Sequence, residues 1–148
     1  MLANPSPFRL FGADHLVVLA LTFVIPLLLG LGARKYGPDS AWTRRVNVFF
    51  VILLLTSFPL KLIVGWAIGL FPDMSNRLPM HLCNWAAIAG VFAFWKNGSP
   101  LAKELLYFWG LAGTLQAVLT PELPYGFPHP GFLVFFGLHS GIVAAALY

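Results

Sequence analysis

The chain has 148 residues, of which 59% are hydrophobic and only 9% are charged, and its mean hydropathy is +0.81. Because an ordinary soluble domain carries about 25% charged residues, this composition excludes a soluble globular protein and predicts an integral membrane protein. The net charge of +4 does not indicate a nucleic-acid partner, since the basic residues lie mostly beside apolar stretches.

Five apolar stretches approach the ~20 residues that an α-helix needs to cross a hydrocarbon core about 30 Å thick, and none alternates as a transmembrane β-strand does. We therefore predict an all-α, polytopic transmembrane helical bundle that forms one membrane domain over residues 1–148. The five spans are expected at residues 16–33, 46–70, 78–95, 101–119 and 131–148. The last stretch is still apolar at Tyr148, so we expect the chain to be truncated there and the bundle to be part of a larger one.

Basic residues gather in the connections on one side of the predicted bundle. They are Arg34, Lys35, Arg44, Arg45, Lys96 and Lys103. By the positive-inside rule, residues 34–45 and 96–103 form cytoplasmic loops, and the N-terminus lies outside. The sequence thus predicts a multi-pass protein of the cell membrane.

On this topology, polar residues from all five spans reach the outer half of the membrane. Lys61, for example, lies about 22 Å along a span that starts inside at Val46. The others are His15, Cys83, Gln116 and His139. Ionisable groups in a membrane are costly and are functional candidates by default. The alternatives are that Lys61 extends to the interface, that His15 is a border residue and that Gln116 holds two helices together.

Cys83 is the only cysteine, so no intrachain disulfide can form. A lone cysteine usually packs as a small hydrophobe, but this one shares a helix face with Gly90, where a neighbouring helix or a substrate chain can come close. His81 would be turned roughly 200° away from Cys83 on a regular helix, unless Pro79 makes that turn irregular. His139 is therefore the better candidate for the base that activates the thiol.

The fourth span places Trp109 and Gln116 on one face, where tight packing is the alternative to substrate contact. The loop at 120–130 holds four prolines, which restrict its backbone, and it is expected to form a stiff cap over the polar residues or simply a rigid connector. Glu122 and His129 in this loop are candidates for accessory polar contacts. The Cys and His residues lack the spacing of a structural zinc site, so neither metal nor cofactor is expected.

Long segments of the chain carry a family resemblance. They are FGADHL, LPMHLCNW, YFWGLAGTLQAVLTPELPYGFPHP and FFGLHSGIV. They resemble the YwaF-like family of bacterial integral membrane proteins, which is similar to a eukaryotic transmembrane acyltransferase family that moves acyl chains between phospholipids to build ether lipids. The resemblance implies that Cys83 is the nucleophile and His139 the catalytic histidine. Relatives continue beyond the histidine segment, which again implies missing C-terminal spans.

The leading hypothesis is a lipid acyltransferase, or a lipid hydrolase if water is the acceptor, that acts on membrane phospholipid at the outer leaflet. Cys83 and His139 would be catalytic. Substrate or oxyanion contacts would come from His15, Lys61, His81, Trp109 and Gln116. Two alternatives remain open: a non-catalytic binding or transport protein with a polar cavity in its outer half, and a structural subunit. Missing spans or a second copy of the chain are possible partners.

Overall fold

The computed structural model describes residues 7–69, 80–96 and 98–148, and every regular element within these ranges is a helix. The elements are α1 (Ala13–Tyr36), α2 (Ala41–Ala67), α3 (Leu82–Phe94), α4 (Pro100–Trp109), the π-helix η2 (Gly110–Thr114), α5 (Leu115–Leu119) and α6 (Pro130–Leu147). Three of them, α1, α2 and α6, are long and apolar enough to cross a membrane. The prediction of an all-α membrane bundle is confirmed.

Local sequence signals explain where the helices begin. The Ser40 hydroxyl accepts a hydrogen bond from the backbone N–H of Thr43 and so caps α2. Ser99 caps α4 in the same way, and Pro100 follows it at the first helical position. Such caps satisfy backbone donors that a helix leaves unpaired, and proline there loses no hydrogen bond. Helix α2 therefore starts several residues before its predicted span at 46–70, and α4 starts at the edge of its predicted span at 101–119.

The regular part of α3 is shorter than the apolar stretch predicted at 78–95. It spans 13 residues, or about 20 Å at 1.5 Å per residue. His81 precedes it with extended backbone (φ −76°, ψ 143°), and Lys96 follows it in the left-handed region with φ 49°. The helix ends because Trp95 has extended backbone (φ −76°, ψ 122°), and the left-handed Lys96 after it cannot continue a right-handed helix. The predicted ends at residues 70 and 78–79 lie outside the described residues.

The predicted fourth span is one unbroken run, α4–η2–α5, with a π turn in its middle that the sequence did not reveal. At Gly110 an added Cβ would lie 2.9 Å from the Cβ of Ala146, so glycine allows α6 to pack closely there. At Gly113 an added Cβ would meet the Leu82 side chain at the start of α3. The π segment therefore lies where this helix packs against both α3 and α6. Single π turns inside α-helices are frequent at functional sites.

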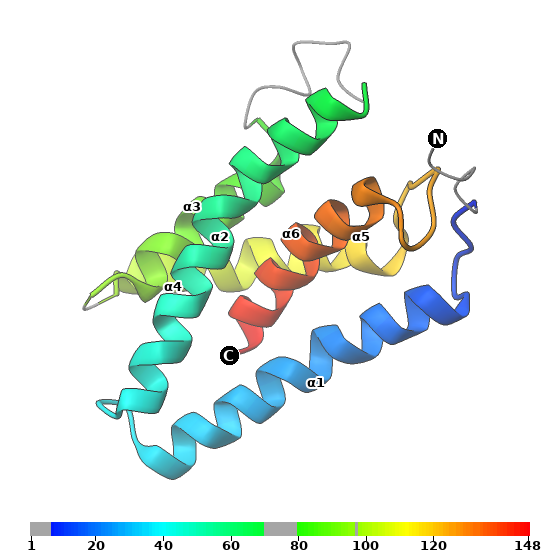
Figure 1. Cartoon of the computed structure of the whole chain (residues 1–148). Coiled ribbons are helices and arrows are strands. Elements are labelled where there is room, and N and C mark those ends of the chain that lie inside the picture. The colour runs from blue at the N-terminus through cyan, green and yellow to red at the C-terminus, as the bar shows by residue number, and fades with distance from the viewer. Residues whose placement is uncertain (1–6, 70–79, 97) are drawn as a thin grey trace.

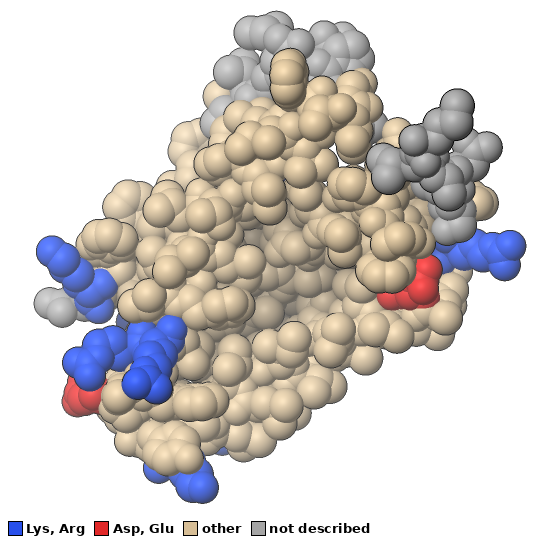
Figure 2. All heavy atoms as spheres, viewed as in Figure 1, with Lys and Arg blue, Asp and Glu red and all other residues tan. Residues whose placement is uncertain are grey.

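Helix α6 lies at the centre of the bundle, in contact with every other helical element (Figure 1). Its buried positions are largely small or β-branched, and Gly141 faces Leu53 of α2. Small residues let helices approach closely in membranes. Helix α1 is peripheral, and its leucines and valines are mostly exposed. On the face in Figure 2, charged side chains lie toward the ends and uncharged ones cover the middle, as expected for a surface in contact with lipid.

Candidate active site

A cavity of about 490 Å³ lies between the C-terminal end of α2, the start of α3 and the first half of α6. Four of the residues predicted to be catalytic or to contact substrate line it: Lys61, His81, Cys83 and His139. Residues 122–125 of the proline-rich loop line it as well, which agrees with the expected cap. We call this space the thiol cavity. The structure thus brings together the two residues proposed to be catalytic and two of their proposed substrate contacts.

Cys83 and His81 both line the thiol cavity, although helical geometry placed them about 200° apart. The reason is that His81 lies outside the helix. Its backbone is extended, and its carbonyl accepts hydrogen bonds from the N–H groups of Asn84 and Trp85. The rotation of 100° per residue applies only from Leu82 onward, so His81 can turn toward the same space as the half-buried thiol. The turn before α3 is thus irregular, which was the alternative to the separation of 200°.

The hydrogen bond of His139 fixes which ring nitrogen can act as a base. Nδ1 lies 2.7 Å from the carbonyl oxygen of Phe135, one turn earlier on α6. A carbonyl only accepts, so Nδ1 carries a proton, and the neutral ring has its lone pair on Nε2. The Phe135 ring stacks on the imidazole with 4.1 Å between ring centroids. These two contacts hold the imidazole in one orientation within the thiol cavity.

Asn84 also lines the thiol cavity, and the sequence reasoning did not single it out. Its side chain is only 3% exposed, and its amide nitrogen Nδ2 has no hydrogen-bond partner among the described residues. An unpaired buried donor costs about 1–3 kcal/mol. Natural proteins retain such groups mainly where a ligand or water completes them. An amide at the start of an apolar helix was the signal that could have revealed it.

Lys61 gives the thiol cavity a cation. It is half-buried on α2 and lines the cavity together with Cys83 and His139. His81 lines the same cavity from the residue before α3. Glu122 lines the cavity from the loop side, and its carboxylate is exposed. The site therefore offers a thiol, an imidazole, a buried amide and a cation within one space.

His15 is not among the residues that line the thiol cavity. Its ring is fully buried on α1, where Nδ1 accepts a hydrogen bond from the Phe11 N–H at 3.0 Å. Nε2 must then carry the proton and donates it to the Val118 carbonyl of α5 at 2.8 Å. The rings of Phe8 and Phe136 pack around it. Both ring nitrogens are occupied, and His15 ties α1 to α5.

Replacing His15 by leucine is expected to lower the free energy of unfolding by about 2–4 kcal/mol, because two backbone groups lose their partner in an apolar surrounding. The unfolding midpoint in detergent measures this loss. Leu16→Ala, at an exposed position of the same helix, is the matched control and is expected to shift the midpoint little. A His15→Leu protein of unchanged stability that had lost an activity would instead place His15 in the functional site.

Gln116 and Trp109 also lie away from the thiol cavity. The Gln116 side chain is exposed and donates a hydrogen bond of 2.6 Å to the Thr120 hydroxyl. Trp109 is half-buried and packs against the apolar core between α2, α3, α4 and α6. His129 caps α6 by accepting from the Gly131 N–H, and Tyr125 stacks on its ring. Within the described ranges, no group of three or more His, Cys, Asp and Glu residues could hold a metal ion.

Comparison with known proteins gave one family. The model of the TMEM164 family, a family of transmembrane proteins, matches residues 10–148. This match covers nearly the whole chain, including every helix of the structure. Comparisons with curated proteins and with solved structures found no match.

Proposed function

Because the chain belongs to the TMEM164 family of transmembrane proteins, and because its Cys83 and His139 line one cavity, we propose that it is a membrane-embedded, thiol-dependent phospholipid acyltransferase. The observation that carries the proposal is that three groups line the thiol cavity together: the Cys83 thiol, the oriented His139 imidazole and the buried Asn84 amide, whose Nδ2 has no partner among the described residues. The substrate is a membrane phospholipid of the outer leaflet. The protein crosses the cell membrane several times, with its N-terminus outside.

In the first half of the reaction, the Cys83 sulfur attacks the carbonyl carbon of a phospholipid ester. His139 Nε2 takes the thiol proton, because its Nδ1 is already engaged with the Phe135 carbonyl. The Asn84 Nδ2–H group donates a hydrogen bond to the oxyanion that forms. When the carbon–oxygen bond breaks, the departing alkoxide takes the proton from His139, and the acyl chain remains on Cys83 as a thioester.

In the second half, a hydroxyl group of a lysophospholipid attacks the thioester carbonyl. His139 Nε2 removes the hydroxyl proton, and after the carbon–sulfur bond breaks the thiolate of Cys83 recovers it from His139. The products are a new phospholipid and the free enzyme, and no redox partner or cofactor is needed. If water enters in place of the lysophospholipid, the same steps hydrolyse the lipid.

The test is a transfer assay with purified protein in vesicles that contain a phospholipid labelled in its ester-linked acyl chain and an unlabelled lysophospholipid. We expect the label to move into the acceptor, with one lysophospholipid released for each chain transferred. Label that appears only as free fatty acid indicates the hydrolase form of the same chemistry. No movement of label above that in protein-free vesicles would contradict the proposal.

Asn84→Leu is expected to lower the transfer rate about 10²–10³-fold, the usual loss for one oxyanion donor. The unfolding midpoint should stay the same or rise, because an unpaired buried amide is removed at similar volume. Ser140→Ala is the matched control: its hydroxyl is also buried without a partner among the described residues, but it does not line the thiol cavity. That variant should gain or keep stability and keep its transfer rate. If Asn84→Leu transferred acyl chains as fast as Ser140→Ala, Asn84 would be excluded from the chemistry.

One observation favours a second function, a non-catalytic protein that binds an anionic headgroup: the cation of Lys61 lies in the same cavity. Binding of a labelled anionic phospholipid separates the two. If binding is the whole function, Lys61→Met should weaken lipid binding about fivefold or more, and Cys83→Ser should leave lipid binding unchanged. Neither the original protein nor the Cys83→Ser variant should then turn over the lipid. In the acyltransferase, Cys83→Ser abolishes turnover of a lipid that still binds.

A further inference from the structure

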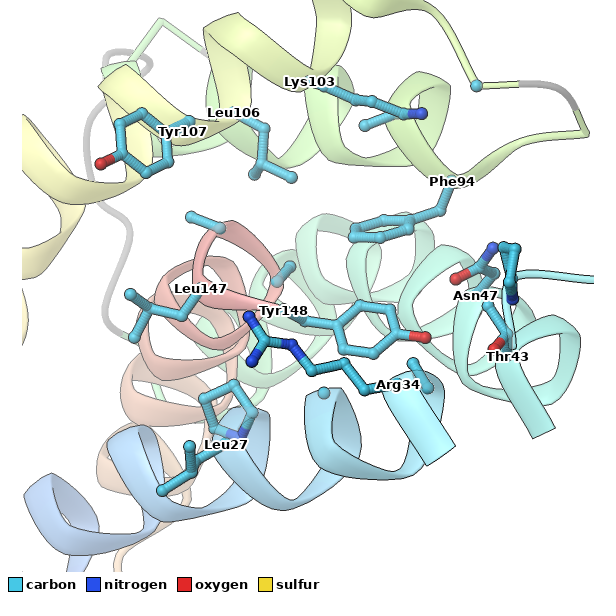
Figure 3. Close-up of a pocket in the computed structure, with 18 of the residues that line it drawn as sticks. Leu27, Arg34, Thr43, Asn47, Phe94, Lys103, Leu106, Tyr107, Leu147 and Tyr148 are labelled. Atoms are coloured by element: carbon cyan, nitrogen blue, oxygen red, sulfur yellow. The ribbon is translucent and has the colours of Figure 1, made fainter. Parts of the chain in front are cut away.

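A second cavity, of about 970 Å³, lies at the opposite ends of α2, α3 and α6 from the thiol cavity. Its walls also include the C-terminal half of α1 and one side of α4 (Figure 3). This volume is at the upper end of the range of about 300–1,000 Å³ found for pockets that bind small molecules. It takes no part in the proposed acyl transfer.

Three cationic side chains line this second cavity, from three separate segments of the chain: Arg34 in the last turn of α1, Lys96 after α3, and Lys103 in α4. Glu104 is the one acidic side chain among its described lining residues. The excess of positive charge favours an anionic ligand. We call this space the basic cavity. Arginine and lysine together suit a phosphate, since the guanidinium binds two oxygens at once and each ammonium adds a point charge.

Beneath the basic rim, the walls are partly polar and mostly apolar. Figure 3 shows the Arg34 side chain beside Tyr148, whose hydroxyl is directed toward Thr43 and Asn47. Leu27 and other apolar side chains line the rest of the wall, and Leu27 itself is 62% exposed. A small soluble anion would fill only the polar part. A ligand that matches the entire cavity carries an anionic headgroup and a hydrocarbon chain.

We propose that the basic cavity binds an anionic phospholipid, with its phosphate between Arg34, Lys96 and Lys103 and an acyl chain along the apolar wall of α1. These cations lie on the side that the basic loops assign to the cytoplasm. That leaflet holds the anionic lipids, and basic pockets between helices on that side are suited to their headgroups. The site would retain such a lipid at the far end of the bundle from the thiol cavity.

Native mass spectrometry of the purified protein, released from micelles that contain phosphatidylglycerol and phosphatidylcholine with the same acyl chains, tests this proposal. We expect a preferential complex with one phosphatidylglycerol. Each of Arg34→Gln, Lys96→Gln and Lys103→Gln should weaken this complex about fivefold, and the triple variant should lose the preference. Arg34→Lys, which keeps the charge, should retain most of it.

The matched control is the triple variant Lys35→Gln, Arg44→Gln and Arg45→Gln, which removes three exposed cations from the same end that do not line the basic cavity. It should keep its preference within about twofold. An equal loss in both triple variants would contradict the proposal, because general surface charge would then explain the preference. Displacement of the lipid by millimolar inorganic phosphate would reassign the cavity to a small anion, and a lipid-free dimer would reassign it to a second copy of the chain.

Discussion

Replacing Cys83 by alanine is expected to reduce acyl transfer by about 10³-fold or more, to the level of protein-free vesicles, because the sulfur that carries the acyl chain is removed. Cys83 is the only cysteine of the chain, so no second thiol can substitute for it. Initial rates with the labelled phospholipid measure the loss. The thiol is half-buried and packs against the edge of the core, and alanine removes only its sulfur atom, so the unfolding midpoint should change by only a few degrees.

Cys83→Ser refines this test, since serine keeps the shape of the side chain but is a much weaker nucleophile in the absence of strong activation. Its transfer rate should be close to that of Cys83→Ala, and its lipid binding should equal that of the unchanged protein. A Cys83→Ala protein that transfers acyl chains within about threefold of the original rate would show that the thiol is a packing residue only, as most buried lone cysteines are.

Replacing His139 by alanine is expected to lower the transfer rate about 10²–10⁴-fold, the usual contribution of a positioned general base. The thiol then loses the group that accepts its proton, and the departing alkoxide loses its proton donor. Since the substitution leaves space beside Phe135, added imidazole should recover part of the rate. Measurements of rate with and without imidazole distinguish a chemical role from a structural one.

Gln116→Ala is the control for this experiment. Gln116 was a candidate for the oxyanion contact, but its side chain is exposed, bonds to Thr120 and does not line the thiol cavity. It should keep its rate within about twofold. If Gln116→Ala lost as much activity as His139→Ala, the active site would lie outside the thiol cavity. If His139→Ala kept its stability but its rate did not recover in imidazole, proton transfer by His139 would be contradicted.

Much of the fold followed from composition and the distribution of charge. The long apolar stretches predicted α1, α2 and α6, and the basic connections marked one end of the bundle. The short α3 and the π turn at Gly110–Thr114 could not be predicted in this way. Both depend on local backbone conformation and on close packing against α6, which apolar periodicity along one segment does not encode.

For the site, depth and helix face led to the prediction that Cys83 and His139 form a pair, and both residues line one cavity. They were insufficient for His15, because the carbonyl that its ring contacts lies 103 residues away at Val118. A polar residue at this depth can either line a functional site or hold two helices together. Only the groups that it contacts in the structure distinguish these two roles. Asn84 was not predicted, although an amide in an apolar helix carries a cost similar to that of an ionisable group.

The most direct measurement is the intact mass of the protein after incubation with a phospholipid of one defined acyl chain. We expect a gain equal to one acyl group replacing one hydrogen, which neutral hydroxylamine removes, and fragmentation should place it on Cys83. The gain should be absent from Cys83→Ala and should accumulate when no lysophospholipid acceptor is supplied. A protein whose mass stays unchanged under these conditions, or a gain that persists in Cys83→Ala, would contradict acyl transfer through Cys83.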